Sequence, residues 1–530
     1  MNTTPVEQFI AEFARFASDA AAHDSALWTP LLARSSVLRG ATVREISSVL
    51  DVMLDATRPR VEASEHHTCV VDDKALVAIL SELGAGLGPA SAESTESLDS
   101  AALVRIERLY QQLGPESRAR RYLLRMLAAD ASRASLAALA EAVAADPPRE
   151  GHDALIAMAP LMQRRQYPAE AMFPRLLDAI AHKNIASVVL DVTNHVARKG
   201  IVRVHPAAKR VKHFAELLTA IVSKLERIEQ HPDKVGLSAA ELQHAVSEAM
   251  ALVIGLCDAL GLIGDKSAAG KLHQVLELSH RRLRTEAAAA LARLGDEAGT
   301  QALIGLAGEP PVRTIALFYL DELGMGDSAA AEHRTPEARA EGELAAWLAM
   351  PGQFGIAPHS IAVIDSCSQH WPGYAEAVDC YLVRYELHLP RGRLTGVGIV
   401  GPVVWSMAAD LEDLPPADIY AIYAGWHAEH EDIQETDAAD LPLDAKAELA
   451  RTAQRLVDLG LQEPSLVKSG RFFGESTAVF SARRGALTGS VVVAGDEIHW
   501  FAGGVSSRPI GPDEAYFIYK GRSLLRAFNP

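Results

Sequence analysis

Basic residues are in short supply in this sequence. Its 530 residues include 51 lysines and arginines against 68 aspartates and glutamates, which gives a net charge of −17 at pH 7. Binding to nucleic acid depends mainly on Lys and Arg side chains that contact phosphates. We therefore do not expect nucleic acid to be the main partner, although the composition leaves room for a local basic stripe.

Cysteine is also scarce, and long apolar runs are missing. The four cysteines, Cys69, Cys257, Cys367 and Cys380, are widely spaced, which is typical of buried thiols in a cytosolic protein rather than of a disulfide framework. No run approaches the roughly 20 apolar residues that a membrane span needs. Residues 1–16 lack the basic segment and apolar core of a secretory signal. We expect a cytoplasmic protein without a membrane partner.

Aromatic residues are rare in the first three-fifths of the chain. Five of the six tryptophans and seven of the eleven tyrosines follow Gly326. Patterns typical of strands also begin only after this point, whereas helical spacing begins at once, with Phe9, Phe13 and Phe16. The sequence therefore predicts two domains, a helical one over residues 1–334 and an α+β one over residues 335–530.

A repeat of 29 residues organises the helical part. Leu283-Arg284-Thr285 opens an Ala-rich segment that ends at Leu294-Gly295, and Val312-Arg313-Thr314 opens a second that ends at Leu323-Gly324. Such a period predicts stacked helix pairs, none of which buries its apolar face alone. Gly295 is expected to end one helix in the left-handed conformation, and Asp296 to accept a hydrogen bond from the next helix's free N–H groups.

This repeat resembles HEAT-like repeats of the phycobilisome-lyase type over roughly residues 252–327. The resemblance implies an α-solenoid and leaves the ligand open, because many proteins with this repeat are scaffolds without catalytic activity. The helices expected on the N-terminal side are taken as degenerate repeats of the same kind; these are 43–57, 74–83, 135–143, 153–161, 170–181, 185–198 and 213–229.

The α+β domain is predicted from strand patterns that are separated from helices. Strands are expected at 380–389 and 397–404, and later at 477–481, 490–493, 498–501 and 516–519, with helices at 418–434 and 445–459 between the two groups. Gly396, Gly398 and Gly401 match the spacing of a dinucleotide-binding loop, but a strand rather than a helix follows them. We expect no cofactor.

Two sets of basic residues are candidates for binding a partner. The first is a stripe without acidic residues, and the second recurs at the repeat starts: Arg198, Lys199, Arg203, Lys209, Arg210 and Lys212; Arg281, Arg282, Arg284 and Arg313. The stripe suits phosphate or an acidic partner, and equally suits basic residues that complement helix C-termini. The arginines of the second set suit a concave binding face, or pairing within a repeat with Asp296 and Asp327.

His427 and His430 are the best candidates for metal ligands. A spacing of three places both imidazoles on one face of a helix, and imidazole suits zinc, copper or iron. The pair matches neither metalloprotease motif, and a third ligand must come from elsewhere, with His359, His370, His388 and His499 as candidates. A solvated helix end where acidic residues bind the histidines is the alternative.

These patterns favour a scaffold without catalytic activity, which binds a protein or peptide along a curved solenoid surface. One alternative is an enzyme with a metal-dependent site near His427 and His430. Another is nucleic-acid binding through the stripe from Arg198 to Lys212. The sequence does not indicate an oligomeric state, and no motif in it specifies a reaction.

Overall fold

The chain forms two compact units, residues 1–303 and 304–530. The computed structural model describes residues 4–18, 28, 31–58, 73–88, 97–231, 238–371, 374, 376–389, 392–407, 411–430, 433–436, 441, 443–472, 475–494 and 497–502. No strand precedes Ser360 among these residues, so the predicted fold, a helical solenoid followed by an α+β region, is confirmed. The boundary placed after residue 334 stays a prediction.

The first unit consists of helices alone within its described residues. Its elements are α1 (Pro5–Ser18), η1 (Ser35–Gly40), α3 (Val43–Ala56), α4 (Asp73–Gly86), α5 (Ser100–Gln112), α6 (Ala119–Asp130), α7 (Arg133–Ala145), α8 (Gly151–Gln163), η2 (Ala169–Met172), η3 (Arg175–Ala181), α9 (Lys183–Arg198), η4 (Ala208–Arg210), α10 (Val211–Gln230), α11 (Ala239–Ile263), η6 (Lys266–Ala268), α12 (Ala269–Leu276), α13 (Arg281–Arg293) and the first part of α14 (Glu297–Leu306).

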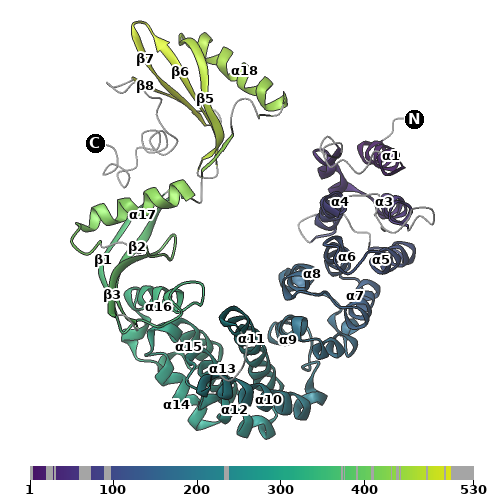
Figure 1. The fold of residues 1–530 in the computed structure, drawn as a ribbon, viewed down its shortest axis with the longest axis vertical. Coiled ribbons are helices and arrows are strands. Elements are labelled where there is room, and N and C mark those ends of the chain that lie inside the picture. The colour runs from purple at the N-terminus through teal and green to yellow at the C-terminus, as the bar shows by residue number, and fades with distance from the viewer. Residues whose placement is uncertain are drawn as a thin grey trace. The chain divides into compact units, whose positions relative to one another are not determined.

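These helices form two rows. In the first row each helix contacts the next, in the order α4, α6, α8, α9, α11 and α13. In the second row α3 contacts α5, α5 contacts α7, and α10 contacts α12. The labels of the first row lie along the inner side of the curve that this unit makes in Figure 1. Two parallel rows of paired helices are the arrangement of an α-solenoid.

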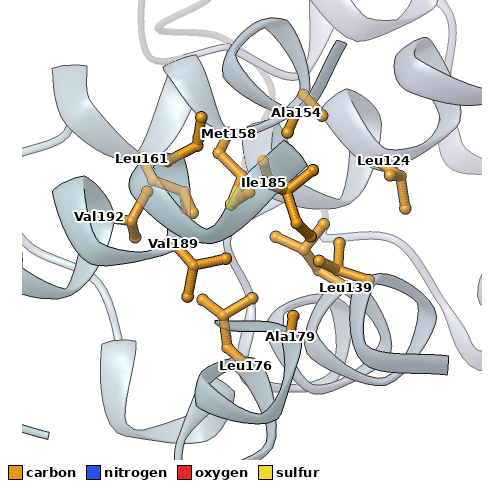
Figure 2. Packing of buried hydrophobic residues seen from close by; sticks show 14 of the residues in the cluster. Leu124, Leu139, Ala154, Met158, Leu161, Leu176, Ala179, Ile185, Val189 and Val192 are labelled. Carbon is orange, nitrogen blue, oxygen red and sulfur yellow. The ribbon is translucent and has the colours of Figure 1, made fainter. Parts of the chain in front are cut away.

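Apolar side chains at helical spacing hold the rows together. In α9, Ile185, Val189 and Val192 are almost fully buried and lie on one face, three or four residues apart. Figure 2 shows them beside Met158 of α8 and Leu176 of η3, in one cluster. Burial of this kind contributes about 25 cal/mol for each Å² of apolar surface removed from water, so each helix depends on its neighbours for stability.

The predicted helix ends are confirmed. Gly295 has φ +77° and Gly324 has φ +69°, which is the left-handed conformation that glycine adopts at little cost after a helix. Asp296 Oδ1 accepts a hydrogen bond from the Gly299 backbone N–H at 2.8 Å. Its other carboxylate oxygen lies 3.0 Å from His273 Nε2. Gly295 and Asp296, which separate the two repeats, therefore end one helix and cap the next as the sequence predicts.

The continuous helix expected over 170–181 is wrong. The structure has two short 3-10 helices there, η2 and η3, with Pro174 between them. Proline lacks an N–H group and its ring clashes with the preceding turn of an α-helix. The apolar spacing of this segment correctly predicts which residues are buried. A single α-helix does not form because Pro174 interrupts it.

Helix α11 has the length and composition of a membrane span without containing the uninterrupted apolar run that the sequence analysis looked for. Among the described residues, Glu241–Ile263 is the one helical segment long and apolar enough to cross a membrane by length and composition, with a hydropathy of 1.9. Glu248 and Asp258 interrupt it, so the inspection for uninterrupted apolar runs missed it. In the structure α11 packs against α9, α10 and α13, and core helices of soluble proteins meet the same criterion.

The second unit contains the end of α14 and two antiparallel sheets. Its elements are α15 (Pro310–Glu322), η7 (Gly326–Ser328), η8 (Ala331–Arg334), α16 (Pro336–Leu348), β1 (Ser360–His370), β2 (Ala377–Leu389), β3 (Gly392–Val400), α17 (Pro416–His430), β4 (Ile433–Thr436), α18 (Leu443–Asp458), β5 (Gln462–Phe472), β6 (Glu475–Arg484), β7 (Leu487–Ala494) and β8 (Glu497–Ala502). The strand orders are β1-β2-β3 and β4-β5-β6-β7-β8.

Helices cover these sheets in layers. Leu344 of α16 shares an apolar cluster with Val383 of β2. Tyr423 of α17 shares another with β2 and β3, to which Val479 of β6 also belongs. Leu456 of α18 packs on the other face of the larger sheet. Both faces of the three-stranded sheet are therefore covered, one by α16 and one by α17.

The two sheets contain hairpin sequences that match at five of six positions. Arg391-Gly-Arg-Leu-Thr-Gly396 leads into β3, and Arg484-Gly-Ala-Leu-Thr-Gly489 leads into β7. A tryptophan follows on the next extended segment in both, because Trp405 pairs with Ile399 and Trp500 with Val491. Helix α16 precedes the first hairpin and α18 the second. The second unit therefore repeats one arrangement, a helix followed by antiparallel strands, which the sequence analysis did not predict.

Most predicted strands are present, with shifted ends. The strand expected to reach Val404 ends at Val400, because Gly401 has φ +147° and Pro402 has no N–H to continue the ladder. The glycines of the apparent dinucleotide loop thus lie in and after β3. Strands β1, β4 and β5 were missed, and β5 contains Pro464 and two register shifts. The strand expected at 516–519 lies outside the described residues.

Candidate functional site

A groove opens on the first row of helices, over α8, α9 and α11. It has a volume of about 250 Å³ and is lined by Leu155, Met158, Ala159, Met162, Val188, Asp191, Val192, Asn194, His195, Arg198 and Asp258. We call it the α8–α9–α11 groove. Apolar walls with a few polar groups are typical of binding sites.

Helical spacing explains which side chains reach the groove. Leu155, Ala159 and Met162 lie four and three residues apart, so α8 presents them on one face. Met158 between them is buried and forms part of the core visible in Figure 2. Leu155 is 52% exposed and Met162 is 37% exposed. The α8 wall therefore offers apolar surface that the fold itself does not cover.

The floor of the groove is held by a charged cluster. The Arg198 guanidinium forms an ion pair with Asp258, and Arg293 of α13 lies 3.3 Å from the same carboxylate oxygen. All three side chains are largely buried, with 9% to 21% of their surface exposed. Ion pairs with this little access to water are screened less than surface pairs. Asp258 thus connects three successive helices of the first row.

Asp191 is the acidic group that stays unbalanced. It forms no ion pair or side-chain hydrogen bond with any described residue, and its side chain is exposed. Neighbouring protein nevertheless removes water from part of the carboxylate, and this desolvation, with a smaller effect of the Asp258 charge, raises the pKa of Asp191 to about 6. Exposure and desolvation are compatible because the group lies in a recess, where water reaches it from one side.

His195 lies one turn after Asp191 on the same face of α9. Burial lowers its pKa below the ordinary value, and the positive charges of Lys199 and Arg198 act in the same direction. The imidazole is therefore neutral at pH 7. Asn194 lies behind it and donates a hydrogen bond to the Gly255 carbonyl at 2.9 Å, which ties α9 to α11.

Only part of the predicted basic stripe remains available to a partner. Lys199, Arg203, Lys209 and Lys212 are exposed, and Lys212 lies 4.0 Å from Glu216. Arg198 binds Asp258 in the groove, as described above. The stripe is therefore divided between the groove floor and the surface around η4.

Arg210 and His205 of the same segment have structural contacts. Arg210 forms an ion pair with Asp178 at 2.7 Å and donates to the Leu177 carbonyl at 3.0 Å. His205 is buried, accepts a hydrogen bond from the Ala207 N–H and lies 3.1 Å from Asn194 Oδ1. Burial lowers the pKa of His205 to about 4, so this histidine is neutral.

The arginines at the repeat starts differ in their surroundings. Arg282 lies 2.7 Å from the buried carboxylate of Glu286. Arg281 is exposed and Arg284 is half-buried. Arg313 is only 6% exposed, donates to the Ala338 carbonyl at 2.7 Å and lies 3.2 Å from Glu341. Arg313 therefore stabilises the contact between α15 and α16.

The two metal candidates are in α17, as expected. His427 is 9% exposed and its ring centroid lies 6.2 Å from that of Trp371. The side chain of His430 lies outside the described residues. His359 and His388 stack on each other elsewhere, with ring centroids 4.0 Å apart. Within the part of the chain that the structure describes, no three His, Cys, Asp or Glu side chains gather so that they could hold a metal ion.

Asp191, Leu155 and Met162 were not among the predicted site residues. A signal for Asp191 was available, because it is the only acidic residue of α9 and stands between Leu190 and Val192. Asp258 is similarly isolated in the second half of α11. An isolated acid in an otherwise apolar helix indicates either a buried ion pair or a binding group; Asp258 forms the ion pair, and Asp191 is a candidate for the second role.

Three comparisons place the chain among known proteins. A family model of HEAT repeats matches residues 247–320. No curated protein matches the chain. The crystal structure of an engineered protein aligns over 66% of this chain and 95% of its own, at 13% identity and a TM-score of 0.23, which is too low to bear on the fold.

The matched residues run from α11 through α15, which is the stretch that contains the 29-residue repeat. The family match, the repeated sequence and the two rows of helices agree with one another. The α+β region lies outside the match. Residues 247–320 are therefore HEAT-like repeats.

Proposed function

We propose that the protein is a scaffold without catalytic activity, which binds an extended segment of a partner protein along the first row of helices. HEAT repeats suggest a role in protein interaction, because stacked helix pairs expose a long surface without a deep pocket. The observation that supports this proposal most directly is the α8–α9–α11 groove, where accessible apolar side chains and an unbalanced carboxylate lie side by side.

The energetics of the groove favour binding. Leu155 and Met162 keep apolar surface in contact with water, and covering it contributes about 25 cal/mol for each Å². The groove floor is already ordered by the ion pairs of Asp258, so binding does not have to immobilise it. A partner segment that lies along α8 and α9 gains from both effects.

Another recess, between α3 and α5 of the second row, is less suited to this role. It has a volume of about 440 Å³ and is lined by Asp51, Asp55, Arg58 and Arg105 among others. Four of its five charged side chains pair with each other, since Arg105 pairs with Asp51 at 2.7 Å and Arg58 with Asp55 at 3.3 Å, and the fifth, Arg108, is exposed. We therefore assign the partner to the first row.

The proposal is tested with full-length protein and a phage-displayed library of random dodecapeptides. Wild-type protein is expected to retain peptides, and Leu155→Asn to lower their affinity at least tenfold by replacing part of the apolar wall with a polar amide. Val104→Asn is the matched control, because Val104 is similarly exposed, at 46%, but lies on α5 of the second row. Failure of the wild-type protein to retain any peptide would refute the proposal, and so would equal losses in both variants.

A further inference from the structure

The α8–α9–α11 groove has a defined electrostatic character. The titratable groups that line it are Asp191, His195 and Arg198 from α9 and Asp258 from α11, and α8 contributes none. Asp258 is balanced by Arg198 and by Arg293 of α13. Among the described lining residues, Asp191 is therefore the carboxylate that has no ion pair, while the cluster of Arg198, Arg293 and Asp258 beside it carries one net positive charge.

The apolar wall beside this carboxylate fits an aliphatic chain. Leu155, Ala159 and Met162 line the α8 side, and Val188 and Val192 lie on α9 next to Asp191. Lysine and arginine combine such a chain with a positively charged end, and commonly lay the chain along apolar surface while the charge reaches a polar group. An apolar wall that ends at a carboxylate is complementary to both parts of these side chains.

We propose that the groove binds a lysine or arginine side chain of the partner, with its aliphatic part against Leu155 and Met162 and its cationic end at Asp191. This inference rests on the proposed function and specifies the chemistry of the partner segment. The partner is a protein segment in which a basic residue stands next to apolar ones.

The neighbouring groups favour a cation over an anion at this position. An anion that entered the groove would meet Asp191, and Arg198 and Arg293 already bind Asp258. His195 is neutral at pH 7 because burial lowers its pKa, so it does not repel a cation. Desolvation makes the ionised form of Asp191 costly, and a bound cation offsets that cost.

The experiment measures the composition of the peptides that full-length variants select from the same dodecapeptide library. Wild-type protein is expected to enrich lysine and arginine, next to aliphatic residues, at least fivefold over the input library. Asp191→Glu keeps the charge and should keep the enrichment. Asp191→Asn should return the frequency of lysine and arginine among the selected peptides to that of the input library. Asp191→Lys should select acidic peptides instead.

A control is required because the protein is acidic overall, with a net charge of −17, and attracts basic peptides without specific contacts. Glu107→Gln removes one negative charge on α5, in the second row, where Glu107 is exposed. It changes the net charge as much as Asp191→Asn does, and should leave the enrichment unchanged. Circular dichroism of each variant verifies that it is folded.

The outcomes separate this inference from the proposed function. Retention of peptides without enrichment of basic residues overturns the inference and leaves the scaffold proposal intact. Enrichment that persists in Asp191→Asn, or that disappears equally in Glu107→Gln, also overturns it. No retention by the wild-type protein overturns both.

Discussion

The two units use their apolar surface differently. In the second unit the three-stranded sheet is covered on both faces, by α16 and by α17, and the aromatic side chains of Tyr385 and Tyr423 are buried there. In the first unit each helix covers only its neighbours, so Leu155 and Met162 remain accessible on the first row. The comparison teaches that the second unit builds its core from sheets between helices and the first from stacked helices, and that both leave apolar side chains accessible, such as Leu155 in the first unit and Ile364 and Leu487 in the second.

The strongest test of this contrast is a substitution in the layered core. Tyr423 is fully buried in α17, and its hydroxyl donates to the Val397 carbonyl of β3. Tyr423→Ala should destabilise the second unit by about 3–5 kcal/mol, the usual cost of removing a large buried side chain. Denaturant unfolding followed by circular dichroism should show the loss.

The same variant should still bind peptides in the α8–α9–α11 groove, since the groove lies within the first unit. Tyr374→Ala is the control, because Tyr374 is 40% exposed, and it should cost less than about 1 kcal/mol. Loss of peptide binding in Tyr423→Ala would show that the two units do not behave independently.

A second prediction concerns the charged cluster beneath the groove. Asp258→Ala removes the carboxylate that Arg198 and Arg293 share and leaves both guanidinium groups largely buried. Hydrogen bonds to charged groups contribute about 1.5–3 kcal/mol each, so we expect a loss of about 2–3 kcal/mol in the free energy of unfolding.

The matched substitution for this cluster is Asp178→Ala. It also breaks two ion pairs, with Arg210 and with Arg175, but the three side chains are 30% to 46% exposed. Surface pairs contribute about 0–1 kcal/mol, so thermal unfolding should shift little. Equal losses at Asp178 and Asp258 would contradict the role assigned to the cluster.

A third prediction tests the helix ends on which the repeat depends. Gly295→Ala places a Cβ atom at φ +77°, where an L-residue is strained although no neighbouring atom lies within 4 Å. The expected cost is about 1 kcal/mol. Gly305→Ala is the control, because Gly305 lies in the last turn of α14 with open space around it and has no left-handed backbone, and alanine has a higher helix propensity than glycine. Thermal unfolding should show a lower midpoint for Gly295→Ala and a higher midpoint for Gly305→Ala than for the wild-type protein.

The smallest change in the free energy of unfolding is expected from substitution of Asp191, and the direction of this change depends on pH. The folded pKa of about 6 lies above the ordinary value of 3.8, so the folded state binds a proton more tightly than the unfolded state does. The contribution of protonated Asp191 to the free energy of unfolding is therefore fully present below pH 4. It is lost as the pH rises through 6, because the ionised carboxylate destabilises the folded state.

Asp191→Asn should consequently stabilise the protein at pH 7 and give no gain at pH 4. Because the side chain is exposed, solvent screening limits the gain to less than about 1 kcal/mol. Unfolding midpoints of the two proteins at both pH values measure it. A variant less stable than wild type at pH 7 would show that Asp191 has a stabilising partner.

Local patterns were sufficient to predict the helical unit. The apolar spacing, Gly295 and Asp296 specify where α13 ends and α14 begins, because capping depends on a few adjacent residues. Where one residue overrides the spacing, as Pro174 does in the segment 170–181, the prediction fails. In the second unit β5 was missed because Pro464 and its bulges obscure the alternation on which strand prediction depends.

The site was harder to predict than the fold. The sequence indicated Arg198 as a basic residue on the solenoid, but its ion pair with Asp258, 60 residues away, depends on how α9 packs against α11. Arg313 occupies the same repeat position as Arg284, yet it is buried against α16. Charge along the sequence therefore does not reveal which charges remain available to a partner.

The shared carboxylate of Asp258 has a mechanical consequence. A bend that moves α9 and α13 away from α11 stretches two charged contacts at once, since both arginines hold the same oxygen. The contacts of Asp258 therefore stiffen the stack against such a bend and oppose a change in the width of the groove.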